Sequence, residues 1–204
     1  MISIIDYGAG NLMSVKKALD FMGAESEITM DTEKIKNSTH VILPGVGSFG
    51  DAMQSMSERG LTETVKEVAT NGKPFLGICL GLQLLFEESD ESPGVKGLGL
   101  LPGKISAIPK DMGLKVPHIG WNSVEMAKKD GIFKGIPNGS YFYFVHSFYL
   151  NGARNEDVAG TTEYGVKIQC AVEHGNLCAT QFHPEKSSEI GLKVLRNFLE
   201  KGEK

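Results

Sequence analysis

The stretch that decides the fold reads PFLGICLGLQLLFE and occupies residues 74–87. Its first part, residues 74–78, is a short β-rich run, and its second part, residues 80–87, is an apolar helical pattern. Between them lies Cys79, flanked two positions away on each side by a glycine. This G-x-C-x-G form predicts a nucleophile elbow, in which a sharp strand-to-helix turn lifts the thiol to the edge of a sheet.

The same strand-then-helix order is predicted on the N-terminal side of this stretch. Residues 2–5 form a β-rich run, and residues 11–22 follow with a helical apolar face. Residues 41–43 are a second buried strand, and residues 51–71 hold helical segments broken at Gly60. Repeated β-α order predicts an α/β fold with a mostly parallel central sheet and helices on both faces.

The C-terminal half is predicted to be mainly β-structure. Its β-rich runs are residues 104–108, 141–145, 167–172 and 177–182. Residues 173–176 have the composition of a hairpin connection, and residues 188–201 form a terminal helix. We therefore expect an antiparallel β section beside the parallel sheet, and one domain over residues 1–204.

Composition excludes several classes of function. The chain has 204 residues and a net charge of −4, so its field repels nucleic acid and anionic lipid surfaces. No apolar run reaches the roughly 20 residues that a membrane-spanning helix needs, and no secretory signal pattern opens the chain. The three cysteines indicate reduced thiols in the cytoplasm, with Cys170 and Cys178 as core residues.

A thiol nucleophile needs a base, and the tripeptide His183-Pro184-Glu185 is the best candidate. Pro184 favours extended backbone before it, so the side chains of His183 and Glu185 face the same side. The carboxylate can then orient the imidazole toward Cys79. Two structural alternatives stay open at this point: a surface His-Pro turn, and a cysteine that is merely buried in a crowded turn.

The other four histidines carry weaker predictions. His40 precedes a strand and is expected to be solvated, and His174 is expected in a hairpin turn. His118 and His146 lie among aromatic residues, which is typical of packed core histidines or of a partner interface. No His, Cys and carboxylate cluster has metal-ligand spacing, so we predict no metal.

The glycine-rich segment at residues 44–47, Pro-Gly-Val-Gly, follows a predicted strand at the edge where open α/β sheets build their sites. A phosphate-binding loop is disfavoured because Asp51 stands where that motif requires lysine. Glycines here leave backbone N–H groups uncovered, which is what an oxyanion site requires.

Taken together, GICLGLQ at residues 77–83 and HPE at residues 183–185 resemble the class I (triad-type) glutamine amidotransferase family, whose flavodoxin-like domain would cover essentially the whole chain. Four further segments resemble the branch of that family that serves a separate cyclase in histidine biosynthesis: DYGAGN at 6–11, PGVG at 44–47, VPHIGWN at 116–122 and FVHS at 144–147.

The resemblance implies hydrolysis of L-glutamine through a thioester on Cys79, with His183 as base and then acid and Glu185 orienting it. It implies no cofactor, and ammonia delivered to a (β/α)₈-barrel cyclase in a heterodimer. The implied oxyanion residues are Gly45, Val46, Gly47 and Leu80. The implied glutamine-binding residues are Gly47, Gln83, Glu91, Tyr143, Ser147 and Phe148, where tyrosine is expected at the last position. The implied partner interface comprises Asn11, Pro117, His118, Trp121 and Asn122.

Regulation and two alternative functions also follow from the sequence. Val46 is β-branched and resists the positive φ that a flipped peptide needs, so we hypothesise that the isolated subunit holds this peptide inactive until the cyclase and its ligand shift it. One alternative is a glutaminase subunit for anthranilate, aminodeoxychorismate, purine or pyridoxal phosphate synthesis. The other is a cysteine peptidase or a catalytically silent binding module on the same scaffold.

Overall fold

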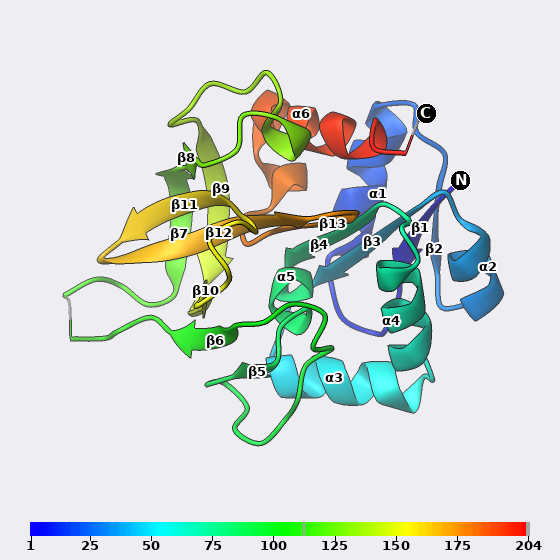
Figure 1. The fold of residues 1–204 in the computed structure, drawn as a ribbon, viewed down its shortest axis with the longest axis horizontal. Coiled ribbons are helices and arrows are strands. Elements are labelled where there is room, and N and C mark those ends of the chain that lie inside the picture. Colours follow the sequence, from blue (N-terminus) through cyan, green and yellow to red (C-terminus); the bar gives the residue numbers. More distant parts are fainter. Residues whose placement is uncertain (112, 203–204) are drawn as a thin grey trace.

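The N-terminal part of the chain alternates strands with helices, and the C-terminal part consists mainly of strands (Figure 1). The first part comprises β1 (Ile2–Ile5), α1 (Leu12–Phe21), β2 (Ser26–Thr29), α2 (Thr32–Asn37), β3 (His40–Gly45), α3 (Phe49–Glu58), α4 (Thr62–Thr70), β4 (Phe75–Cys79) and α5 (Leu80–Leu84). The second comprises β5 (Glu88–Ser89), β6 (Lys104–Ala107), β7 (His118–Ser123), β8 (Glu125–Met126), η1 (Gly131–Phe133), β9 (Tyr141–His146), β10 (Phe148–Asn151), β11 (Val158–Tyr164), β12 (Val166–His174), β13 (Leu177–Thr180), η2 (Pro184–Lys186) and α6 (Ser188–Leu199). This computed structural model describes residues 1–111 and 113–202.

An eight-stranded sheet forms the centre of the protein in the order β2-β1-β3-β4-β13-β12-β11-β8. The strands from β2 to β13 pair in parallel, and β12, β11 and β8 continue the sheet with antiparallel pairs. The predicted α/β fold, a mostly parallel sheet with an antiparallel section, is confirmed. Because β4 and β13 are parallel neighbours, their carboxyl ends meet at one edge of the sheet.

Alternate residues of the parallel strands feed two separate cores. Ile5 of β1 packs in the core that also holds the buried residues of α3, α4 and α5, whereas Ile4 packs with those of α1 and α6. Figure 1 shows these two groups of helices on opposite faces of the sheet. Side chains on a strand point alternately to its two faces, so a run that is apolar at every position, such as residues 41–43, is what a doubly covered sheet requires.

Two smaller sheets lie next to the carboxyl edge of the parallel strands. One has the order β10-β6-β5, and the other pairs β7 with β9 in antiparallel register. The backbone N–H of His183 donates to the carbonyl of Tyr143 on β9 at 2.9 Å, which joins this second sheet to the segment after β13. The sequence did not predict β7 as a strand, because glycine and asparagine interrupt its apolar pattern.

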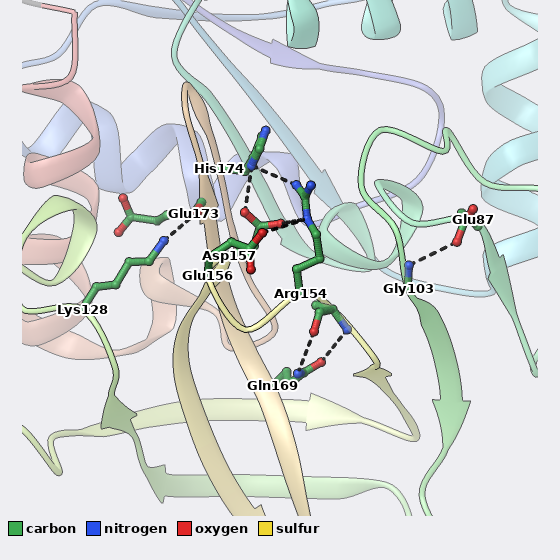
Figure 2. A network of polar contacts seen from close by, with 10 residues as sticks. Glu87, Gly103, Lys128, Arg154, Glu156, Asp157, Gln169, Glu173 and His174 are labelled. Atoms are coloured by element: carbon green, nitrogen blue, oxygen red, sulfur yellow. Dashed lines mark hydrogen bonds and ion pairs between the residues drawn. The ribbon is translucent and has the colours of Figure 1, made fainter.

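A buried carboxylate fixes the turn before β11 (Figure 2). Asp157 accepts hydrogen bonds from Arg154 Nε at 2.8 Å and from His174 Nδ1 at 2.7 Å, and its backbone carbonyl accepts from the N–H of Glu173. Burial opposes the charge on Asp157, but these side-chain bonds hold the pKa of Asp157 below its usual value. His174 is the last residue of β12, and its partner is the Asp157 carboxylate. The hairpin turn that was predicted over residues 173–176 is therefore confined to residues 175–176.

Three further expectations were wrong. His40 is buried, with Nε2 2.8 Å from the carbonyl oxygen of Lys201, because the C-terminal segment covers the start of β3. The helix expected over residues 80–87 ends at Leu84, since the carbonyls of Leu84, Leu85 and Phe86 accept N–H groups from the following loop instead of continuing the helix. The strand expected over residues 177–182 likewise ends at Thr180.

Candidate active site

The elbow at the end of β4 is built by two close backbone approaches. Cys79 has φ 56° and ψ −108°, a left-handed conformation that costs a non-glycine residue about 1–3 kcal/mol. A Cβ at Gly81 would collide with the carbonyl oxygen of Leu43, and one at Gly77 would collide with the backbone of Gly81. The glycines are therefore required for β3, β4 and α5 to pack this closely, and the thiol is placed at the start of α5.

The predicted histidine and glutamate lie beside each other next to this elbow. The Nδ1 atom of His183 is 2.8 Å from Oε1 of Glu185, and their side chains are 3% and 1% exposed. Glu185 Oε1 accepts from His183 Nδ1, so the other ring nitrogen, Nε2, is left for the thiol. Both Cys79 and His183 line the same cleft, so the parallel pairing of β4 with β13 brings the three predicted residues together.

The electrostatics of this group favour a charged imidazole. Burial opposes the charge, but the hydrogen bonds and negative charges of Cys79 and Glu185 outweigh it and raise the pKa of His183 to about 9. The imidazolium is then the main form at neutral pH. A neighbouring imidazolium and a helix N-terminus both stabilise a thiolate, which is the nucleophilic form of cysteine.

A cleft of about 260 Å³ opens in front of the thiol. Its lining comprises Val46, Gly47, Cys79, Leu80, Gln83, Glu91, Pro117, Val145, His146, Ser147, Phe148 and His183. These residues come from the segments after β3, β4, β5 and β13, from the residue before β7, and from the end of β9 with the start of β10. The sequence had predicted most of them in the site, but His146 had been interpreted as a packed core histidine or part of a partner interface.

Three residues predicted for this site lie outside the lining of the cleft: Glu185, which contacts His183, and also Tyr143 and Gly45. The ring of Tyr143 packs edge-on against Trp121 at 6.2 Å between centroids, and its backbone carbonyl holds the N–H of His183. Gly45 is the last residue of β3, in register with Cys79. Tyr143 therefore contacts the catalytic segment through its backbone, and Gly45 lies beside the nucleophile in the sheet.

Hydrogen bonds within the protein leave specific atoms of the cleft for a ligand. The amide nitrogen of Gln83 donates to the carbonyl of Phe148 at 3.0 Å and to Oε1 of Gln181 at 3.1 Å, so its own Oε1 remains as an acceptor. Oε2 of Glu91 accepts from the N–H of Phe49 at 2.7 Å. An amide oxygen and a carboxylate in one small cleft are suited to a cationic ligand group.

Sequence reasoning missed three residues that support the site. Gln181 is fully buried and its Nε2 lies 3.7 Å from the sulfur of Cys79. Ser187 donates to the carbonyl of His183 at 2.7 Å and accepts from the N–H of Tyr143, which fixes the turn that carries the histidine. Tyr7 is also buried, and burial, with a smaller effect of Cys79, raises the pKa of its phenol. Only Gln181 had a usable signal, because alternation in extended backbone places it on the same side as residue 183.

Four of the predicted interface residues, Pro117, His118, Trp121 and Asn122, lie on strand β7 or directly before it, and Asn11 lies directly before α1. Trp121 is 52% exposed, Pro117 and Asn11 are exposed, and Asn122 is half-buried. His118 differs from them because it is only 3% exposed, although it is the first residue of the same strand.

Within residues 1–111 and 113–202, no three histidine, cysteine or acidic side chains are arranged to hold a metal ion. None of the helices in this part of the chain is long and apolar enough to cross a membrane.

The fold is that of solved amidotransferases. A crystal structure described as glutamine amidotransferase matches with a TM-score of 0.76 and 20% identity, covering 98% of this chain and 97% of that one. The structure of PurLQS from Thermotoga maritima matches with a TM-score of 0.74 and 22% identity over 97% and 96% of the two chains. The family model described as glutamine amidotransferase class-I matches residues 3–201. The chain belongs to this family.

Two curated relatives within this family are about 50% identical to this chain. The imidazole glycerol phosphate synthase subunit HisH of Moorella thermoacetica is 53% identical over 197 residues, which cover 97% of this chain and 93% of the relative. The protein of the same name from Methanothermobacter thermautotrophicus is 50% identical over 200 residues, which cover 98% of each chain.

Proposed function

We propose that this chain is the glutaminase subunit of an imidazole glycerol phosphate synthase. The observation that carries the proposal is the buried His183–Glu185 pair, 2.8 Å apart, beside a strained Cys79 at the end of a parallel strand. Identity of about 50% to HisH subunits over nearly the full chain supports the assignment to imidazole glycerol phosphate synthase, and not to another enzyme that uses glutamine.

The geometry supports a thioester mechanism on three residues. The Cys79 thiolate attacks the side-chain carbonyl carbon of glutamine, and the His183 imidazolium gives its proton to the leaving nitrogen, which departs as ammonia. Water then attacks the thioester while His183 takes a proton from it, so glutamate leaves and the thiolate is restored. Glu185 holds the imidazole by its Nδ1 through both steps.

Oxyanion stabilisation would come from backbone N–H groups. The N–H of Leu80 follows the nucleophile directly, and the exposed segment Val46-Gly47 borders the same cleft. Gly47 has φ 100°, whereas Val46 does not adopt a positive φ. This supports our hypothesis that the isolated chain holds the Val46 peptide in an inactive orientation, since turning it requires backbone angles that valine resists.

Glutamine would be recognised at both ends. The free oxygen of Gln83 and the carboxylate of Glu91 suit its α-ammonium group, and Ser147 and Phe148 line the same cleft. Tyr143 and Gly45 would support the site through the hydrogen bond to His183 and the pairing with Cys79.

The partner would be a (β/α)₈-barrel cyclase that receives the ammonia and makes imidazole glycerol phosphate and aminoimidazole carboxamide ribonucleotide. Its docking surface would include Asn11 before α1, and Pro117, Trp121 and Asn122 on or directly before β7. We also propose that residues 1–204 form one domain, that no metal or cofactor takes part, and that the enzyme works in the cytoplasm. Three unbridged cysteines suit such a reducing compartment.

Labelling with a glutamine analogue that alkylates thiols tests the proposed nucleophile. The complex with the cyclase should be modified on Cys79 alone, with Cys170 and Cys178 as internal controls because both are fully buried. Excess glutamine should protect Cys79. Labelling that spares Cys79, or that glutamine does not slow, would contradict the proposal and favour a peptidase or a silent module.

Comparing glutamate release by the chain alone and by the complex with nucleotide bound tests both the partner and the hypothesis on Val46. We expect release to be much faster in the complex. Equal rates would contradict an inactive oxyanion peptide, and copurification with a synthase of another pathway would favour another glutaminase subunit.

A further inference from the structure

Strand β7 has one exposed face, and on its opposite face it carries a buried histidine. Ile119 and Trp121 are 59% and 52% exposed, whereas His118 is 3% exposed. In the antiparallel register of β7 with β9, His118 lies directly opposite His146, which is also buried and lines the cleft in front of Cys79. The two histidines therefore span the distance between the outer strand and the glutamine pocket.

The hydrogen-bond partners of the two rings fix their tautomers. Nδ1 of His146 is 2.9 Å from the carbonyl oxygen of Phe148, which can only accept, so this nitrogen carries the proton. Nε2 of a neutral His146 must then accept, and it does so from Nδ1 of His118 at 2.9 Å. Nε2 of His118 is left as an acceptor, and the amide nitrogen of Asn122 lies 3.5 Å from it.

Both rings are neutral at physiological pH. Burial lowers the pKa of His118 to about 4. Burial also lowers the pKa of His146, to about 3, and the charges of His118 and His183 add to this effect against the hydrogen bond to Phe148. The direction of every bond in the pair is therefore constant across the pH range in which the enzyme works.

The Phe148 carbonyl, which accepts from His146, also accepts from Gln83 in the proposed substrate pocket. The carbonyl of Phe148 receives His146 at 2.9 Å and Gln83 at 3.0 Å, which uses both of its lone pairs. The second amide hydrogen of Gln83 is directed at Gln181. With both hydrogens held, the orientation of the Gln83 oxygen is determined by the position of the Phe148 carbonyl.

We propose that His118 and His146 are positioning residues that hold the Phe148 carbonyl, and through it the glutamine-binding oxygen of Gln83, in register with strand β7. The inference rests on the proposed function, because it assumes that the Gln83 oxygen receives the α-ammonium group of glutamine. Displacement of β7 by a docked partner would then be transmitted to the substrate pocket through two fixed hydrogen bonds.

Three variants, measured in the complex with the cyclase, test the pair. In His146→Phe the donor to Phe148 is lost, so KM for glutamine should rise about 5- to 10-fold, the effect of one hydrogen bond of about 1 kcal/mol. kcat should stay within about 2-fold, because Gln83 is proposed to bind the α-ammonium group and not the amide that is cleaved. His146→Asn restores a donor at the position of Nδ1 and should return KM to within about 2-fold of wild type.

His118→Phe separates the hydrogen bond from packing. The His118 ring is stacked between Tyr164 and Phe144, at 3.9 and 5.0 Å between centroids, and phenylalanine can occupy the same slot. This variant should raise KM by about 2- to 3-fold. His40→Asn, which perturbs a buried histidine outside this group, should leave KM unchanged. The rate of Cys79 alkylation by iodoacetamide should be the same in all of these proteins, because that reagent carries no α-ammonium group.

Nitrogen-15 NMR of the histidine rings gives a readout that does not depend on variants folding. The wild-type protein should show His146 protonated on Nδ1 alone and His118 on Nδ1 alone, with neither titrating between about pH 5 and 8. A His146 proton on Nε2, or unchanged KM in His146→Phe, would overturn the inference while leaving the glutaminase assignment intact. A wild-type complex without glutaminase activity would overturn both.

Discussion

Replacing Glu185 by glutamine separates the charge of the third triad residue from its orienting role. Oε1 of Glu185 accepts from Nδ1 of His183 at 2.8 Å, and among residues 1–111 and 113–202 no group hydrogen-bonds to its Oε2. The glutamine amide is therefore free to turn its oxygen toward Nδ1, so Glu185→Gln should keep the imidazole in place and remove only the charge.

The magnitude follows from the two kinds of hydrogen bond. A bond to a charged group contributes about 1.5–3 kcal/mol and a neutral one about 0.5–1.5 kcal/mol, so the loss is about 1–2 kcal/mol. This corresponds to a decrease in kcat/KM of about 5- to 30-fold. Glu185→Ala also removes the orientation of the ring, and its activity should fall much further.

The assay is glutamate release by the complex with the cyclase, combined with a titration of the His183 ring by NMR. The pKa of His183 should fall below about 9 in Glu185→Gln, because burial is then opposed mainly by Cys79. A raised pKa stabilises the fold while the ring is charged. The stability difference between wild type and variant should therefore be full below about pH 6.5 and disappear as pH rises through about 9. Full activity in Glu185→Gln, or activity as low as in Glu185→Ala, would refute this division of roles.

Two further substitutions test the scaffold. Gly81→Ala should lower stability by about 1–3 kcal/mol and abolish glutaminase activity, because the added Cβ pushes the elbow away from the Leu43 carbonyl; unchanged melting temperature and activity would contradict the required close approach. Asp157→Asn should cost about 1–2 kcal/mol at neutral pH, measured by urea unfolding, because Arg154 and His174 lose a charged acceptor. Since the pKa of Asp157 is held below its usual value, this difference should vanish as pH falls through that lowered pKa, and a difference that persists in acid would indicate a packing effect instead.

The parallel part of the fold could be predicted because its strands are covered on both faces. Residues 2–5, 41–43 and 74–78 are apolar at nearly every position, which distinguishes them from half-exposed strands. Strand β2, Ser26–Thr29, was missed because it lies at the edge of the sheet and is mostly half-buried. The sequence also did not predict that α5 ends at Leu84, because the carbonyls there accept hydrogen bonds from a loop that follows later in the chain.

For the site, local motifs were informative and long-range hydrogen bonds were not. The spacing of residues 183 and 185 predicted their contact, and the glycines around Cys79 predicted the elbow. Alternation places Gln181 on the same side as His183, but the sequence does not indicate that its amide donates to the sulfur of Cys79, or that His118 and His146 share a hydrogen bond. These contacts depend on how β7, β9 and β13 are placed in space, and a single sequence does not encode that placement in a readable pattern.

In our proposal Cys79 releases ammonia from glutamine, and the cyclase that uses this ammonia does not itself need Cys79. The most direct measurement compares glutamine and ammonium as nitrogen donors for the synthase reaction of the complex that carries Cys79→Ala. The account predicts no product with glutamine and wild-type rates with ammonium. Product formation from glutamine by Cys79→Ala, or failure of ammonium to support the reaction in the wild-type complex, would contradict it.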